Sequence, residues 1–200
     1  MGNSRWEKAR RYSHVGMSSS CNFTYALQYQ NAYEILYKSK APVDTIALPM
    51  LYSMRHYLEL SLKSNIEYFH EFSGSKNMVG KTVHTLTSLS NAFQEHWKLS
   101  KRNFNVVVDD TPLMQDFIQL IQELDNIDSY AISFRYSHDR DKNKNFEWLD
   151  TIDIHHLNEL FKGATTLLNH SVDVFEDCTG LMHGSVTKEE LLNSTQTSTS

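Results

Sequence analysis

The chain has 200 residues, a length that fits one domain with a substantial core. Hydrophobic residues make up 40% of it and aromatic residues 12%, which excludes an intrinsically disordered protein, and the net charge of -5 argues against broad electrostatic capture of nucleic acid. No apolar run reaches the roughly 18 to 20 residues that span a bilayer, and the N-terminal residues lack the apolar segment of a signal peptide. We therefore expect a cytoplasmic protein without membrane contact.

Helical periodicity dominates the first half of the chain. Residues 1–20 are rich in basic side chains and are expected to form a basic N-terminal arm. Apolar and aromatic residues then recur at steps of three or four through residues 21–38, which predicts a helix. Pro49 leaves two alternatives for the following segment: a helix that kinks at the proline, or a short turn before a longer helix. The strongest stripe predicts a central core helix and consists of Leu51, Met54, Leu58, Leu62, Ile66 and Phe69.

Three more helices are predicted in the second half. One starts near His84, after a loop with two glycines, and a second runs from Thr111 to Ile127 with Pro112 in its first turn. A polar excursion follows, and Asp153 begins the last long helix. No strand pattern alternates with these helices, so the fold class is all-α, an up-and-down bundle of four or five main helices within residues 21–180. The polar residues 181–200 are expected to form a flexible tail.

The pair Arg55 and His56 raises the first functional question. On a helix these neighbours point about 100° apart, so both cannot lie on the core stripe. Glu59 and Lys63 follow Arg55 at intervals of four residues, which predicts an ion-pair ladder along one face. The ladder either flanks the core, as on many amphipathic helices, or belongs to a cleft that recruits Arg55 and His56 for catalysis.

A second candidate site is the polar segment FRYSHDR, residues 134–140. The guanidinium of an arginine matches two phosphate oxygens, and a histidine with a pKa near neutrality can move a proton. Arg135 and His138 are therefore candidate catalytic residues, and Tyr136 and Arg140 are candidate binding residues. The same side chains also suit an ordinary ion-paired loop.

Metal and cofactor sites have little support in the sequence. His155 and His156 are adjacent, no HxxxH or HExxH spacing occurs, and Cys178 with His183 lacks two further ligands. The phosphate-binding loop, the GxGxxG fingerprint and the GxSxG elbow are absent as well. We expect neither a metal nor a cofactor.

The segment YSMRHYLELSLKSNIEYF, followed by a glycine-containing loop and HTLTSL, resembles the opening of HEPN-domain proteins. Glu59, Leu60, Leu62 and Lys63 match the family's E-L-x-L-K type segment, and His84 and Leu86 match its H-x-L motif. The run Phe134-Arg135-Tyr136 is similar to its later R-Y element, so the resemblance covers roughly residues 21–175.

The resemblance implies a helical bundle that often dimerises, occurs in toxin–antitoxin, phage-defence and CRISPR-associated proteins, and in many members cuts RNA without a metal. The family's catalytic signature is Arg, four to six residues, then His. This chain departs from it, because only two residues separate Arg135 from His138 and three separate Arg10 from His14.

The leading hypothesis is a HEPN-like protein of a bacterial or phage conflict system that acts through RNA or partner binding with a degenerate catalytic site. A homodimer is expected. One rival is an active metal-independent endoribonuclease. In it His138 would act as general acid or base, Arg135 or Arg140 would stabilise the phosphorane, and a symmetry-related Arg55 or His56 would complete the cleft. The other is an immunity or antitoxin-like module that binds a protein. Lys63 and His84 complete the candidate binding residues.

Overall fold

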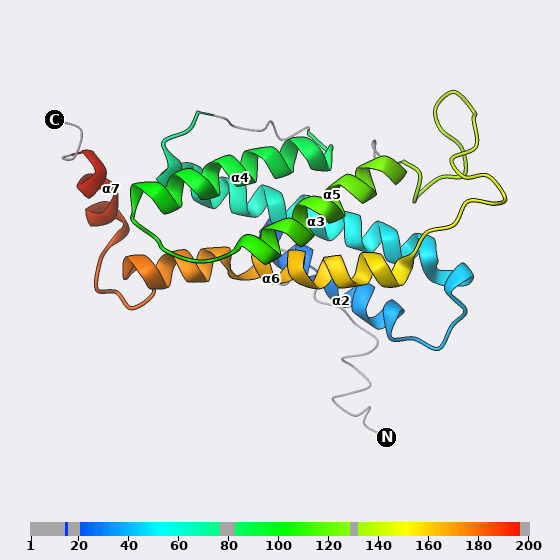
Figure 1. Cartoon of the computed structure of the whole chain (residues 1–200), viewed down its shortest axis with the longest axis horizontal. Coiled ribbons are helices and arrows are strands. Elements are labelled where there is room, and N and C mark those ends of the chain that lie inside the picture. The colour runs from blue at the N-terminus through cyan, green and yellow to red at the C-terminus, as the bar shows by residue number, and fades with distance from the viewer. Residues whose placement is uncertain (1–14, 16–20, 77–82, 129–131, 197–200) are drawn as a thin grey trace, which may run out of the picture.

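The computed structural model describes residues 15, 21–76, 83–128 and 132–196, and the predicted N-terminal arm lies almost wholly outside these ranges. The described residues contain helices and no strand beyond an isolated bridge, so the prediction of an all-α bundle is confirmed (Figure 1). The helices are α2 (Asn22–Tyr37), α3 (Val43–Ser73), α4 (Leu86–Asn103), α5 (Thr111–Ile127), α6 (Ile154–Thr179) and α7 (Lys188–Gln196).

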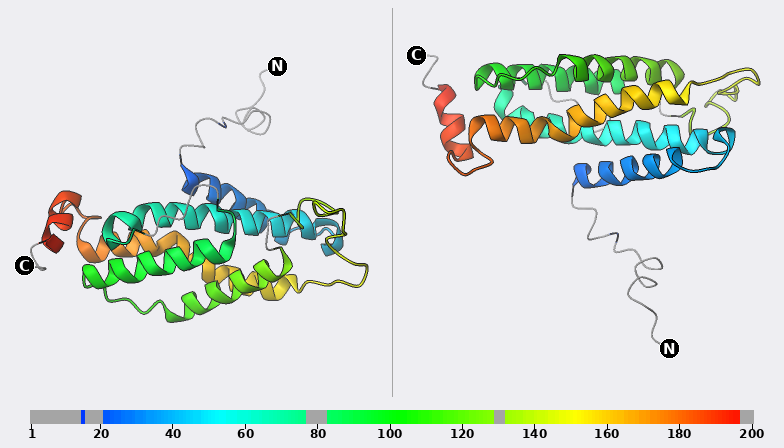
Figure 2. Two further views of the ribbon diagram at one scale, coloured as in Figure 1. Left: turned by 90° about the horizontal axis from the view of Figure 1, so that it is seen from above. Right: turned by 60° about the horizontal axis from the view of Figure 1, so that its bottom comes forward.

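The long helix α3 is the centre of the bundle and contacts α2, α4 and α6 (Figure 2). Arg55, in the first half of α3, bonds the carbonyl of His84 just before α4, and the carbonyl of Phe72, near the end of α3, accepts from Asn103 at the end of α4. The two helices therefore run in the same direction. The connection between them departs from a simple up-and-down order, since α4 begins beside Arg55, part of the way along α3, and not beside the end of α3.

The predicted stripe on α3 forms the core. All six of its side chains are at most 5% exposed, as the three-and-four spacing predicts for a helix with neighbours on several sides. Pro49 lies inside α3, so no separate helix begins there. The side-chain hydroxyl of Ser53 donates to the Pro49 carbonyl at 2.9 Å.

Helices α5 and α6 approach closely at Gly163. A Cβ atom built on Gly163 would lie 2.7 Å from Cβ of Asp116 and would also meet the Asp116 carboxylate. Only a residue without a side chain fits between the two helices at this level.

The predicted flexible tail contains a short helix. Thr187 and Glu190 form a reciprocal cap at the start of α7, in which the Thr187 hydroxyl accepts from the Glu190 backbone and the Glu190 carboxylate accepts from the Thr187 backbone. Leu191 of this helix is buried, with 9% of its surface exposed. The polar composition of residues 181–200 hid this capping box, so the sequence analysis did not predict α7.

Candidate functional site

Arg55 is buried beneath the surface, with only 2% of its side chain exposed. Its Nη2 donates to the carbonyl oxygen of His84 at 3.1 Å. Its Nε lies 3.5 Å from Oδ2 of Asp128, and Nη2 lies 4.0 Å from Oδ1 of Asp125. Burial lowers the pKa of Arg55, while the two aspartates oppose that shift. One guanidinium thus connects α3, the start of α4 and the end of α5.

The predicted ladder forms only in its second half. The Nζ atom of Lys63 donates to Oε1 of Glu59 at 2.8 Å, and Nδ1 of His84 lies 2.8 Å from the same oxygen. Burial raises the pKa of Glu59, but the hydrogen bonds from Lys63 and His84 outweigh it and leave that pKa below its usual value. Arg55 does not join the ladder, because its ion-pair partners lie on α5 and just beyond it.

Asp128 connects the buried guanidinium to the segment that carries Arg135 and Tyr136. Its Oδ1 accepts from the backbone N–H groups of Ile132 at 2.7 Å and Ser133 at 2.9 Å. The backbone N–H groups of Arg135 and Tyr136 then both donate to the Ile132 carbonyl at 3.0 Å. The carboxylate therefore holds the turn, and the ion pair with Arg55 holds the carboxylate.

A group of aromatic rings and one arginine lies on the surface near this turn. His56 stacks on Tyr52 with centroids 5.5 Å apart and meets the Tyr29 ring edge-on at 4.4 Å. The guanidinium carbon of Arg135 lies 6.0 Å from the Tyr52 centroid and 5.5 Å from the Tyr136 centroid. We call Tyr29, Tyr52, His56, Arg135 and Tyr136 the aromatic–arginine cluster. Tyr136 is 58% exposed, so the cluster is open to solvent on that side.

The imidazole of His56 is partly buried among aromatic rings. Burial lowers its pKa, although the nearby Glu59 charge opposes the shift. Among the described residues, the recorded contacts of its ring are the aromatic ones with Tyr29 and Tyr52. A neutral imidazole in this position can accept a proton or a hydrogen bond from a ligand.

His138 and Arg140 lie in a different place. They belong to a hairpin in which Asp139 accepts backbone N–H bonds from Asp141 and Asn143, and His138 pairs with Lys144. His138 lines a shallow depression beside this hairpin, and none of its described contacts reaches Arg55 or His56. The cluster thus combines the predicted residues Arg135, Tyr136 and His56 above a buried Arg55, and it leaves His138 and Arg140 out.

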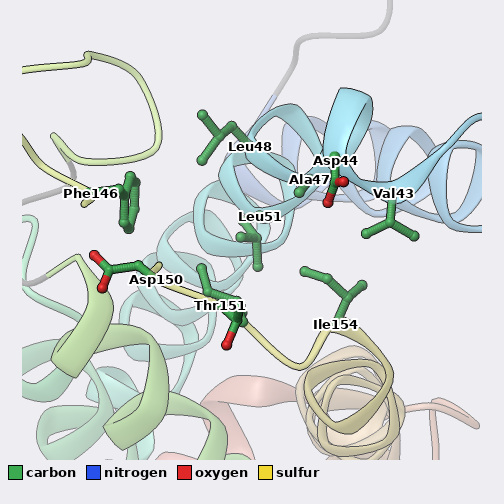
Figure 3. A pocket seen from close by; sticks show the side chains of 10 residues that line it. Val43, Asp44, Ala47, Leu48, Leu51, Phe146, Asp150, Thr151 and Ile154 are labelled. Atoms are coloured by element: carbon green, nitrogen blue, oxygen red, sulfur yellow. The ribbon is translucent and has the colours of Figure 1, made fainter. Parts of the chain in front are cut away.

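A groove lies at the end of the bundle where α3 and α6 begin (Figure 3). Its walls are mainly apolar, with carboxylates of Asp44 and Asp150 beside them. Figure 3 shows the side chains of Val43, Leu51 and Ile154 around one open space. We call it the end groove.

The sequence did not point to Asp125 and Asp128 as members of the site. A signal was present in their positions, because carboxylates at the C-terminal end of a helix interact unfavourably with its dipole and are stabilised by a nearby cation. That cation is Arg55, which the chain places about seventy residues earlier. Sequence spacing alone could not pair them.

No group of three or more potential metal ligands gathers among the residues that the structure describes. Each helix in those ranges is too short or too polar to cross a membrane. Comparison of the chain with family models, with curated proteins and with solved structures finds no match.

Proposed function

We propose that this chain is a HEPN-like protein of a bacterial or phage conflict system that binds single-stranded RNA through the aromatic–arginine cluster and has a degenerate catalytic site. The observation that carries the proposal is the placement of Arg135 against the rings of Tyr52 and Tyr136 on an open surface. Aromatic rings and guanidinium planes stack on unpaired bases, and the arginine can also pair with a phosphate.

Support for the HEPN-like assignment comes from the residues that carry the resemblance. Lys63 and His84 both contact the Glu59 carboxylate, although 25 positions separate His84 from Glu59 in the chain. The R-Y element joins the same network through Asp128 and Arg55. The motifs thus belong to one three-dimensional unit, as expected if they have a common role.

The charge balance favours binding led by stacking. The net charge is -5, and the cations beneath the cluster are balanced by buried carboxylates. Stacking contributes about 1 to 3 kcal/mol per base. Each neutralised phosphate of a single strand instead steepens the slope of log affinity against log salt concentration by about 0.7. We expect RNA affinity with a shallow dependence on salt concentration.

The test is fluorescence anisotropy with a labelled single-stranded RNA of mixed sequence. Arg135→Ala and Tyr136→Ala should each weaken binding about tenfold, which corresponds to roughly 1.4 kcal/mol. Arg102→Ala is the matched control, since Arg102 is an exposed arginine on α4. Equal affinity of all three variants and the wild type would contradict the proposal. Absence of RNA binding by the folded wild type would favour the protein-interaction module instead.

An active metal-independent endoribonuclease is the second candidate. The observation that favours it is the partly buried imidazole of His56 close to Arg135. A neutral imidazole beside Arg135 could take the proton of a ribose 2′-hydroxyl while the guanidinium stabilises the phosphorane. If this candidate is right, the wild type should cleave an RNA pool in EDTA. His56→Ala should lose this cleavage and His138→Ala should retain it. Cleavage lost only in His138→Ala would place the reaction on the hairpin, and no cleavage would remove this candidate.

A further inference from the structure

A depression on the hairpin that follows the aromatic–arginine cluster has the size of a small-ligand site. Its volume is about 410 Å³, and small-molecule pockets usually measure about 300 to 1,000 Å³. It is lined by Ser137, His138, Lys144, Phe146, Glu147 and Trp148, and we call it the hairpin depression. Trp148 is 97% exposed, so the face of its indole ring is open to a ligand.

The hairpin depression is held in place by contacts on both sides of the hairpin. The backbone N–H of Asn145 donates to the Ser137 carbonyl at 3.1 Å, and its side-chain amide donates to the Tyr136 carbonyl at 2.6 Å. Phe146 stacks on the buried Phe134 with ring centroids 6.3 Å apart. The site is therefore preorganised, and a ligand need not order the segment when it binds.

Two opposite charges line the hairpin depression without pairing with each other. Among the described residues, the structure records no ion pair or hydrogen bond that engages the ammonium of Lys144 or the carboxylate of Glu147. Two neighbouring carboxylates are already engaged, because Asp139 accepts the backbone N–H of Asn143 and Asp150 accepts that of Glu147. The depression therefore presents one cationic donor and one anionic acceptor to a ligand.

The charge balance of the hairpin favours contact with a base over contact with a phosphate. Residues 137–150 contain Arg140, Lys142 and Lys144 against Asp139, Asp141, Glu147 and Asp150. Affinity for phosphate comes from an excess of cationic side chains, which this segment lacks. An exposed indole, in contrast, stacks on an unpaired base without needing a positive charge.

Guanine is the base whose polar edge matches this pair of charges. Its O6 atom accepts a hydrogen bond, and its N1–H and N2–H₂ groups donate side by side. An ammonium donates only and a carboxylate accepts only, so Lys144 suits O6 and the two oxygens of Glu147 suit the two donors. The equivalent edges of adenine, cytosine and uracil each carry a single donor group, which would leave part of the carboxylate unpaired.

We propose that the hairpin depression binds one unpaired guanine of the RNA, with the base stacked on Trp148, its O6 atom at Lys144 and its two donor groups at Glu147. The aromatic–arginine cluster then holds the neighbouring nucleotide, because Tyr136 of the cluster and Ser137 of the depression are consecutive residues. This inference rests on the RNA-binding proposal, to which it adds a sequence preference.

Fluorescence anisotropy of the full chain with two labelled RNAs tests the guanine subsite. Each RNA is a short run of uridines whose central nucleotide is either guanosine or adenosine. The wild type should prefer the guanosine RNA about tenfold. Glu147→Gln should lower this preference to about twofold or less, because an amide replaces one acceptor by a donor. Trp148→Ala should weaken the binding of both RNAs about tenfold, because the stacking surface is lost.

The chain offers a matched control for each variant. Leu149→Ala truncates an apolar side chain directly after Trp148 that is 85% exposed and does not line the depression. Glu189→Gln removes an exposed carboxylate on α7. Both controls should bind the two RNAs as the wild type does.

The outcomes separate this inference from the RNA-binding proposal. Equal binding of the two RNAs by the wild type, with both weakened by Tyr136→Ala, would leave RNA binding by the cluster standing and overturn the guanine subsite. A guanine preference that survives Glu147→Gln would overturn the subsite as well. Absence of binding to either RNA by the folded wild type would reject the RNA-binding proposal together with this inference.

Discussion

Replacement of Arg55 by methionine would test the idea that one buried guanidinium connects three segments of the chain. Methionine keeps most of the apolar bulk of the side chain and removes the charge and the hydrogen bond to the His84 carbonyl. Asp125 and Asp128 would then be left without their shared cation. Asp128 would retain its two backbone N–H bonds, and Asp125 would retain its bonds from Thr87.

The expected cost is about 3 kcal/mol. Removal of one partner of a buried ion pair usually costs about 3 to 5 kcal/mol. The lower end applies here because the ion-pair distances are long, at 3.5 and 4.0 Å, and because Nε and Nη1 of Arg55 have no hydrogen-bond partner among the described residues. In a protein of this size about 1 kcal/mol shifts the melting temperature by roughly 2 to 4 °C, so the loss should reach about 6 to 12 °C.

Urea unfolding followed by helical circular dichroism measures this loss directly. The control is Lys38→Met, which removes an exposed pair with Glu34 on α2 and should cost at most about 0.5 kcal/mol. A loss below about 1 kcal/mol for Arg55→Met would refute the reasoning, because the guanidinium would then be no more important than a surface charge.

Two further changes test other parts of the structure. Burial lowers the pKa of folded His56 below its ordinary value of 6.5, so the unfolded chain takes up the proton first and stability declines as the pH falls from 6.5 toward the folded pKa. His56→Gln should remove that part of the decline, which urea midpoints on either side of pH 6.5 can measure; an identical decline in both proteins would contradict the assignment. Gly163→Ala should lower stability by about 1 to 2 kcal/mol, because overpacking against Asp116 outweighs the gain in helix propensity, and a raised urea midpoint would show that α5 and α6 can separate freely.

Much of the fold could be predicted from the sequence because helix formation and core burial follow a local period. Three features depend only on neighbours within a few turns of helix. They are the stripe from Leu51 to Phe69, the helix that begins beside Pro112 and the start of the last long helix at Asp153. The helix α7 was missed although its capping box is just as local, because its composition is polar.

The candidate site depended on contacts between distant parts of the chain. The sequence placed Arg55 and His56 next to each other. Only the tertiary positions of His84, Asp125 and Asp128 decided that Arg55 is buried while His56 joins the surface rings. Tertiary structure likewise decided the direction of α4 and the pairing of Arg55 with Asp128. It also decided that Arg135 lies in a turn beside the cluster while His138 lies in the hairpin that follows. Periodicity determines which face of a helix is apolar. Which side chains of other segments lie against that helix depends on how the whole chain is folded.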